Sequence, residues 1–329
     1  MRDRRGWIAP VAVGMFALAI GLVLGSGPLR TALIGSLGVQ VDSLEDQVAE
    51  AELAADQANV TNDYGDEWVD ATAPQLLGTT LAGRTVAFVS VDDADAEAVA
   101  GAQAHVVQAG GTVAASVTVE SLWTDPNQSA FRAALAPQLA SSISGLDGTE
   151  TVDQVFSQAL AQALLPGTAD PAAESAGSGD EADANAADPI GPNEEDRGAV
   201  LWALLTDAEL VSGTRTGPAD AIVMVAGEAP SDAGESSLQV TANLTLIGVF
   251  AGYDAPIVAA NGPDADDDLV ASVLADAAVL APRVSTVTWI DTTYSQVTVA
   301  LALREQFDGW VGHYGPGEGR EAAPPPIEP

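Results

Sequence analysis

The stretch 85-TVAFVSVDDADAEAVAGAQAHVVQAGGTVAASVTV-119 decides the fold class. Thr85–Val91 and Thr112–Val119 are short apolar runs rich in β-branched residues, which predicts two buried strands. Between them, apolar residues recur at helical spacing after an acidic start, and Gly110-Gly111 ends the pattern. The order strand, helix, strand is a βαβ unit, which implies parallel strands and a Rossmann-like layered α/β architecture.

The rest of the chain continues this alternation of helices and strands. The expected helices are residues 129–142, 151–165, 199–210, 237–251, 265–280 and 292–307. The expected strands are residues 220–227, 256–260 and 284–290. Residues 61–84 contain several Gly and Pro and are interpreted as a connector, and the glycine-rich residues 309–319 as a flexible exit from the domain.

Composition shifts along the chain predict its domain organisation. In order, the parts are a cytoplasmic basic tip with a transmembrane anchor (1–30), a coiled-coil stalk (31–62), a first α/β half (63–165), a disordered acidic loop (166–198), a second α/β half (199–308) and a Gly/Pro-rich tail (309–329). The acidic loop has almost no large apolar side chain, so it cannot bury enough surface to offset the entropy of ordering. A calcium-binding loop is the alternative, but the stretch lacks a D-x-D-x-D-G-like register.

The N-terminal stretch is expected to be a membrane anchor. Residues 6–29 carry no charge, and their apolar core approaches the length of a membrane-spanning helix. Arg2, Arg4 and Arg5 precede it, so the positive-inside rule places the C-terminal domain outside the cytoplasm. A cleavable signal peptide is the alternative, although no A-x-A-like site follows Leu24. We therefore expect an uncleaved, single-pass signal anchor in the cell membrane, with association with the outer envelope as a further option.

A heptad pattern follows the anchor. Its apolar residues are spaced alternately three and four apart: Ile34, Leu37, Val41, Leu44, Val48, Ala51, Ala55 and Ala58. This pattern predicts a helix that associates with a second copy as a short coiled coil. The alternative is an amphipathic helix that packs on its own domain.

The charge balance excludes one class of partner. The chain has 47 Asp and Glu against 11 basic residues, all of them Arg, and a formal net charge of −36. Nucleic-acid binding requires a basic surface, so we exclude it. Frequent Ala, Gly, Val and Asp without Lys is also typical of a GC-rich genome, which would explain part of the acidity without any partner. Because Cys is absent, disulfides, thiolate metal sites and cysteine nucleophiles are excluded.

No catalytic or cofactor-binding residues are assigned from the sequence. The chain lacks a G-x-S-x-G elbow, an H-E-x-x-H motif, a P-loop and a G-x-G-x-x-G fingerprint after the first strand. The cluster Asp264, Asp266, Asp267 and Asp268 precedes an expected helix, where carboxylates usually match the helix dipole. We therefore expect a protein that is not an enzyme and that has no resident cofactor.

No metal site is assigned either. Cu(I) prefers thiolate and thioether ligands, and the chain offers only Met1, Met15 and Met224. The two histidines are His105, within an expected helix, and His313, within the expected flexible tail. A satisfied surface or core position is the more common role for such histidines, and Cu(II) contact would need additional carboxylates.

The whole chain nevertheless resembles a known family. The segments that carry the resemblance are the anchor FALAIGLVLGSGPL (16–29), the heptads after it, the strand and helix that end at Gly110-Gly111, and the ending with VSTV (284–287) and GHYGPG (312–317). Together they resemble the actinobacterial copper-transporter family typified by mycobacterial MctB, which includes SteB-like envelope proteins. No copper ligands are carried over from this resemblance.

The resemblance implies a cell-envelope protein of an actinobacterium that takes part in copper efflux and tolerance, with copper as the transported ion. It also implies a link to envelope integrity and daughter-cell separation, together with a membrane protein partner. A single membrane span cannot enclose a pore, so conduction would require oligomers or that partner. Two hypotheses therefore stay open, namely copper transport and a non-enzymatic coiled-coil scaffold for envelope or cell-division partners.

Overall fold

The structure is a computed structural model of the 329-residue chain. It describes residues 13–18, 20, 28–166, 194–227, 233–253, 255–263, 268–317, 319–321 and 324–325. The chain divides into two compact units, Met1–Gly65 and Asp66–Pro329. Most of the predicted anchor, and residues 167–193 of the predicted acidic loop, lie outside the described residues.

The predicted stalk is helical, but its helix is longer than expected. Helix α2 (Pro28–Leu77) is 50 residues long, so the prediction of a connector over residues 61–84 is wrong as far as Leu77. Proline usually ends a helix, yet Pro74 lies inside this one. Ala73 and Leu77 are fully buried in the core of the second unit. Burial of this helix face therefore outweighs the unfavourable helix propensity of the local sequence.

The second unit is built on one sheet. Within the described residues, its strand order is β3-β2-β1-β4-β5-β6-β7. The strands are β1 (Thr85–Val91), β2 (Thr112–Val119), β3 (Val211–Arg215), β4 (Ala221–Ala226), β5 (Ile257–Asn261), β6 (Ser285–Val287) and β7 (His313–Tyr314). Among the strand pairs of the described chain, β2 and β3 alone pair in antiparallel fashion. The predicted βαβ unit is confirmed, since β1 and β2 pair in parallel from Thr85↔Thr112 onward.

The helices agree with the sequence pattern in type and differ at their ends. They are α3 (Ala96–Gln108), α4 (Ser129–Ala140), α5 (Val152–Leu164), α6 (Glu194–Asp207), α7 (Ala233–Ala251), α8 (Leu269–Ala275) and α9 (Thr293–Phe307). Helix α6 begins at Glu194, so residues 194–198 of the predicted disordered loop are helical instead. The reason is packing, because Gly198 lies close to the Gln162 carbonyl at the end of α5, and a Cβ atom there would come within 3.0 Å of that oxygen.

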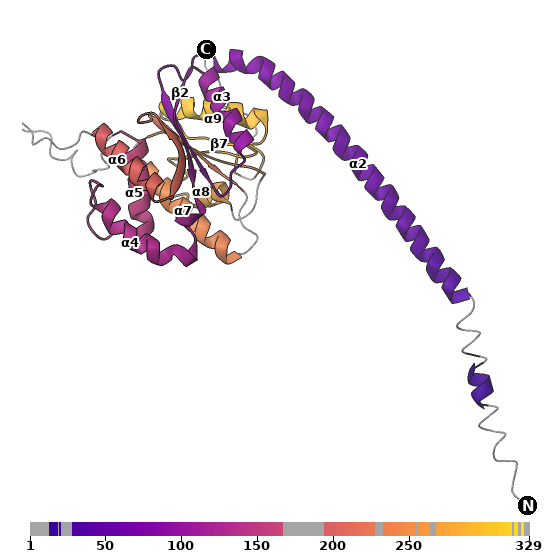
Figure 1. The fold of residues 1–329 in the computed structure, drawn as a ribbon. Helices are drawn as coiled ribbons and strands as arrows, with labels where there is room; N and C mark the ends of the chain where they lie inside the picture. Colours follow the sequence, from indigo (N-terminus) through magenta and orange to yellow (C-terminus); the bar gives the residue numbers. More distant parts are fainter. Residues whose placement is uncertain are drawn as a thin grey trace, which may run out of the picture. The chain divides into compact units, whose positions relative to one another are not determined.

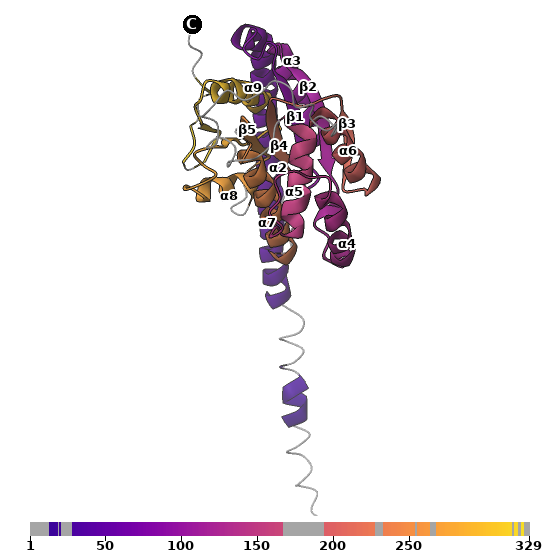
Figure 2. The same ribbon diagram turned by 90° about the vertical axis from the view of Figure 1, so that its left-hand side faces the viewer.

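Helices cover both faces of the sheet, as Figures 1 and 2 show. Strand β1 explains how, because its side chains alternate between the two faces. Val86 and Phe88 belong to the core shared with α3, α9 and the last turns of α2. Ala87, Val89 and Val91 belong to the opposite core, shared with α4 to α8. This is a three-layer α/β arrangement, as expected from the sequence.

The C-terminal residues contradict the prediction of a flexible tail. His313 and Tyr314 form β7, which pairs in parallel with β6. The Tyr314 ring is 2% exposed, and its hydroxyl donates a hydrogen bond to the Glu305 carboxylate. Gly315 adopts a φ of 116°, which allows the chain to turn directly after the strand. The glycines thus serve an ordered turn, and the buried tyrosine holds the segment on the sheet.

Candidate functional site

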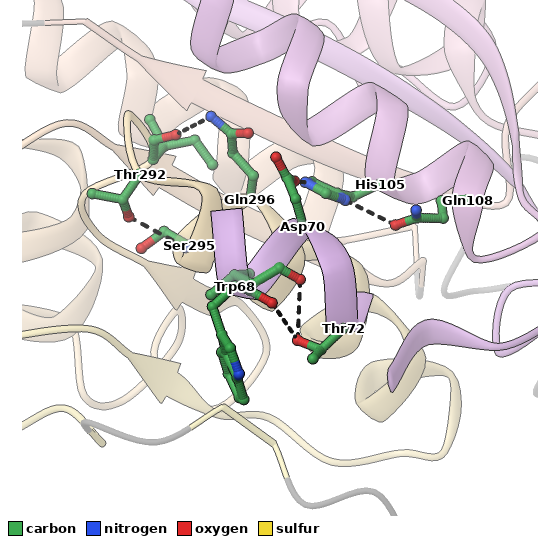
Figure 3. A network of polar contacts seen from close by, with 10 residues as sticks. Trp68, Asp70, Thr72, His105, Gln108, Thr292, Ser295 and Gln296 are labelled. Atoms are coloured by element: carbon green, nitrogen blue, oxygen red, sulfur yellow. Dashed lines mark hydrogen bonds and ion pairs between the residues drawn. The ribbon is translucent and has the colours of Figure 1, made fainter. Parts of the chain in front are cut away.

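His105 lies in the buried face of α3. Figure 3 shows its ring between Asp70 of α2 and Gln108 of α3. The Nδ1 atom is 3.1 Å from Gln108 Oε1, and the Nε2 atom is 3.9 Å from Asp70 Oδ1. These partners orient the imidazole and tie the last turns of α2 to α3. The sequence offered no sign of them, because the Asp70 segment was interpreted as a connector.

His313 and Met224 are also part of the structural framework. His313 Nδ1 lies 3.0 Å from Thr286 Oγ1 across the pairing of β6 with β7. Burial lowers the pKa of His313, and a hydrogen bond with the Ala281 backbone acts in the opposite direction. Met224 is fully buried within β4. Each of these candidate copper ligands is therefore engaged in packing or hydrogen bonding within the head.

The described part of the chain holds no group of three or more His, Cys, Asp or Glu side chains placed to bind a metal ion. Of the aspartate cluster, Asp264, Asp266 and Asp267 lie outside the described residues. Asp268 caps α8, since its Oδ1 accepts a hydrogen bond of 2.7 Å from the Ala271 amide. The sequence predicted that carboxylates here match the helix dipole, and the structure shows that Asp268 also caps the helix through its side chain.

The strand order identifies a different candidate site. From β1 the chain proceeds by way of α3 to β2 on one side, whereas β4 leads by way of α7, α8 and α9 to β7 on the other. The direction of winding therefore changes between β1 and β4. In open α/β sheets, ligands bind at this switch point, outside the carboxyl ends of the strands. Here that position is a cavity of about 670 Å³, which we call the carboxyl-edge cleft.

The backbone at the carboxyl-edge cleft is tightly constrained. Asp92 and Asp93, directly after β1, have φ values of 55° and 53°, which are uncommon for residues other than glycine. Gly227, directly after β4, donates an amide hydrogen bond of 3.0 Å to the Val91 carbonyl. A side chain at Gly227 would collide with the Asp92 carbonyl oxygen. The ends of β1 and β4 are therefore locked together, which holds both aspartates at the rim of the cleft.

The cleft is lined by carboxylates. Asp92, Asp93, Asp95 and Asp291 are among its lining residues. Burial raises the pKa of the Asp92 carboxyl, a hydrogen bond from Asn243 opposes this effect, and the charge of Asp93 raises the pKa further. Asp95 occupies the N-terminus of α3, where its Oδ1 accepts a hydrogen bond of 2.9 Å from the Glu97 amide.

These properties limit what the cleft can bind. A phosphate at this position would need free amides at the start of α3 and the absence of negative charge. Asp95 takes one of those amides, and the neighbouring carboxylates repel an anion. Oxygen-rich surroundings instead suit hard cations and hydrogen-bond donors, and they do not provide the soft ligands that Cu(I) prefers. The sequence predicted Asp92 and Asp93 only as the start of a helix, because the neighbouring β4 cannot be inferred from the local pattern.

The fold and the site define a three-layer α/β protein that follows a long N-terminal helix and carries an acidic cleft at the carboxyl edge of its sheet. Residues 1–325 match the family described as "Copper transport outer membrane protein, MctB", so the chain belongs to this family. It is 31% identical over 323 residues to proteins named copper transporter MctB from Mycobacterium tuberculosis (strain ATCC 25618 / H37Rv) and Mycobacterium bovis, with 94% of each chain covered. The protein of the same name from Mycobacterium leprae is 26% identical over 318 residues, again with 94% of each chain covered.

Proposed function

We propose that this protein acts in copper efflux and tolerance at the cell envelope. The observation that carries the proposal is the family match, which extends over residues 1–325 and so includes the N-terminal segment as well as the head. The curated relatives that cover 94% of the chain are named copper transporters. Copper is then the transported ion, and the protein has no resident cofactor.

We further propose that residues 6–29 anchor the chain in the cell membrane as a single span, with the head outside the cytoplasm. This proposal rests on the uncharged stretch and on the preceding arginines. In the described residues, no helix combines the length and the apolar character needed to cross a membrane. Reporter fusions at the C-terminus test the orientation, and an N-terminal sequence that starts after Ser26 or Gly27 would contradict the anchor.

A non-enzymatic role is supported by how the polar side chains at the carboxyl edge are used. Asp95 and Asp268 cap helices, and Asp92 accepts a hydrogen bond from the buried Asn243. These carboxylates therefore hold the backbone in place. Within the described chain, the side-chain hydrogen bonds of Asp92 and Asp95 go to Asn243 and to the Glu97 amide, not to a nucleophile or a histidine. General acid–base catalysis would need such a pairing within hydrogen-bond reach of a substrate.

The second candidate function is a scaffold, and α2 supplies the observation that favours it. Every residue from 47 to 65 is exposed, including the large apolar side chains of Val48, Leu53, Val60 and Tyr64. An isolated helix without tertiary packing is marginally stable in water. This segment also contains only acidic charged residues, so it lacks the i,i+4 ion pairs that support solvated helices. A partner along the helix, either a second copy or another envelope protein, would supply the missing burial.

Two readouts in one deletion strain separate the two functions. The strain is complemented with the full chain, with a chain that lacks residues 31–60, and with a matched control in which an unrelated semi-rigid helix of equal length replaces residues 31–60. Copper transport requires that the full chain restores growth in copper. The scaffold hypothesis requires that cell separation is restored by the full chain and by neither altered chain. Failure of the full chain to restore copper tolerance would refute the first proposal.

A further inference from the structure

The amino edge of the sheet, opposite the carboxyl-edge cleft, carries a second cavity of about 550 Å³. It is formed by residues just before β1, β5 and β6, by the C-terminal end of α7, and by the end of α9 with the segment after it. The residues that matter for its chemistry are Arg84 before β1, Arg283 before β6, and Phe307, Trp310 and Val311 at the end of α9. We call this cavity the amino-edge pocket. Its volume lies within the range of small-molecule sites.

The charge of the amino-edge pocket opposes the charge of the chain. Two of the 11 arginines line it, although the chain carries 47 acidic residues. No Asp or Glu is among the described residues that line the pocket, and neither guanidinium forms an ion pair with a carboxylate of the described chain. Asp308 lies between two lining residues in the sequence but does not line the pocket itself. The pocket therefore presents positive charge without a counter-ion from the described residues.

Both guanidiniums keep donors for a ligand. The Arg84 guanidinium lies 4.2 Å from the centre of the Phe307 ring, a cation–π contact that orients it without using its N–H groups. Arg283 Nη1 is 3.5 Å from the Ala251 carbonyl, which is the long limit of a hydrogen bond. Guanidinium groups offer a planar set of donors that matches carboxylate and phosphate oxygens.

An exposed tryptophan forms the apolar wall. Trp310 is 71% exposed, yet its backbone is fixed by the end of α9. Gly309 adopts a φ of 86°, and the Trp310 amide donates a hydrogen bond of 3.1 Å to the Glu305 carbonyl. This is a glycine-terminated helix end, which sets the position of the next residue. Covering the indole and Val311 with an apolar group would remove considerable apolar surface from water.

We propose that the amino-edge pocket binds a small anion in which a carboxylate or phosphate lies next to an apolar group. The arginines take the anionic group, and Trp310 with Val311 covers the apolar part. A net charge of −36 repels a polyanion at long range, which restricts the ligand to one or two negative charges. This binding site is independent of copper transport and of the scaffold hypothesis.

The test uses the full chain in an uncharged detergent and three probes that share a phenyl ring. N-acetyl-L-phenylalanine carries a carboxylate, phenyl phosphate carries a phosphate, and N-acetyl-L-phenylalanine amide carries no charge. Calorimetry should show binding of at least one anion and at least about tenfold weaker binding of the neutral amide. Comparison of the two anions identifies the preferred group. Absence of binding by both anions, or equal binding of the amide, would overturn the proposal.

Variants then locate the site. Arg84→Gln and Arg283→Gln should each weaken the anion by about tenfold or more. The matched control is Arg132→Gln, since Arg132 follows β2 at the other edge and donates to backbone carbonyls there. Trp310→Phe keeps an apolar wall, so it should retain binding of the anion in the same calorimetric titration. Unchanged affinity in both pocket variants, with folding verified by circular dichroism, would refute the assignment.

Discussion

Replacing Leu77 with Ala tests whether the end of α2 belongs to the core of the head. The Leu77 side chain is 0% exposed and lies in the cluster formed with α3, α9 and one face of the sheet. Fully buried Leu→Ala changes typically cost about 2–5 kcal/mol, because apolar contact is lost and a cavity remains. For a unit of this size, each kcal/mol lowers the melting temperature by roughly 2–4 °C. We therefore expect the melting temperature to fall by about 4–20 °C.

The control is the same substitution on the same helix, so helix propensity cancels. Leu53 is 62% exposed, and Leu53→Ala should change the stability of the head by less than about 0.5 kcal/mol. Both variants are measured in the full chain by thermal and urea unfolding, with tryptophan fluorescence as the probe. If Leu77→Ala cost no more than Leu53→Ala, the last turns of α2 would not be part of the core.

Three further predictions concern copper, pH and association. Titration with Cu(I) against a competing chelator should show no stoichiometric high-affinity site. The double change His105→Ala with His313→Ala should leave Cu(II) uptake nearly unchanged, since both rings are engaged in the fold. A one-to-one copper complex that is lost in this double variant would contradict both expectations. Burial raises the pKa of Asp92, so the folded chain binds this proton more tightly, and stability should fall as pH rises from the unfolded pKa through the folded one. Asp92→Asn should remove that part of the pH dependence in urea titrations between about pH 3 and pH 7, and an identical profile would show that Asp92 does not cause it. Replacing Val41 and Leu44 with Asp should convert a dimer to a monomer in analytical ultracentrifugation, whereas an unchanged mass would mean that the heptads do not associate.

Elements with strong local periodicity could be predicted from the sequence. Strand β1, helix α3 and strand β2 were found because both periods are clear and Gly110-Gly111 marks the boundary between helix and strand. Strand β3 was missed because VSGTR has no apolar run, and four of its five residues are not buried. Its identity as a strand comes from antiparallel pairing with β2, a contact that no local pattern records.

The candidate sites were harder to predict, because each joins residues that are distant in the sequence. The pair of aspartates after β1 is visible in the sequence, but the close approach of Gly227 depends on β4 lying next to β1. Similarly, Arg84 and Arg283 reach one pocket only because β1 and β6 begin at the same edge of the sheet. Strand order brings these residues together, and it could not be derived from composition or periodicity.

Among the described residues, carboxylates line the cleft at the carboxyl edge of the sheet and arginines line the pocket at the amino edge, and this bears on how the overall acidity is interpreted. Genome composition can raise the number of aspartates and exclude lysine, but it does not decide where the few arginines lie. Surface ion pairs contribute little to stability, and the ion pair found among the described residues joins His105 to Asp70, so it is the position of Arg84 and Arg283 that distinguishes them. Both line a pocket without a carboxylate among its described residues, beside an exposed Trp310 that the end of α9 holds in place. Composition accounts for the background charge, and an anionic ligand is the occupant of this pocket that matches both the arginines and the indole.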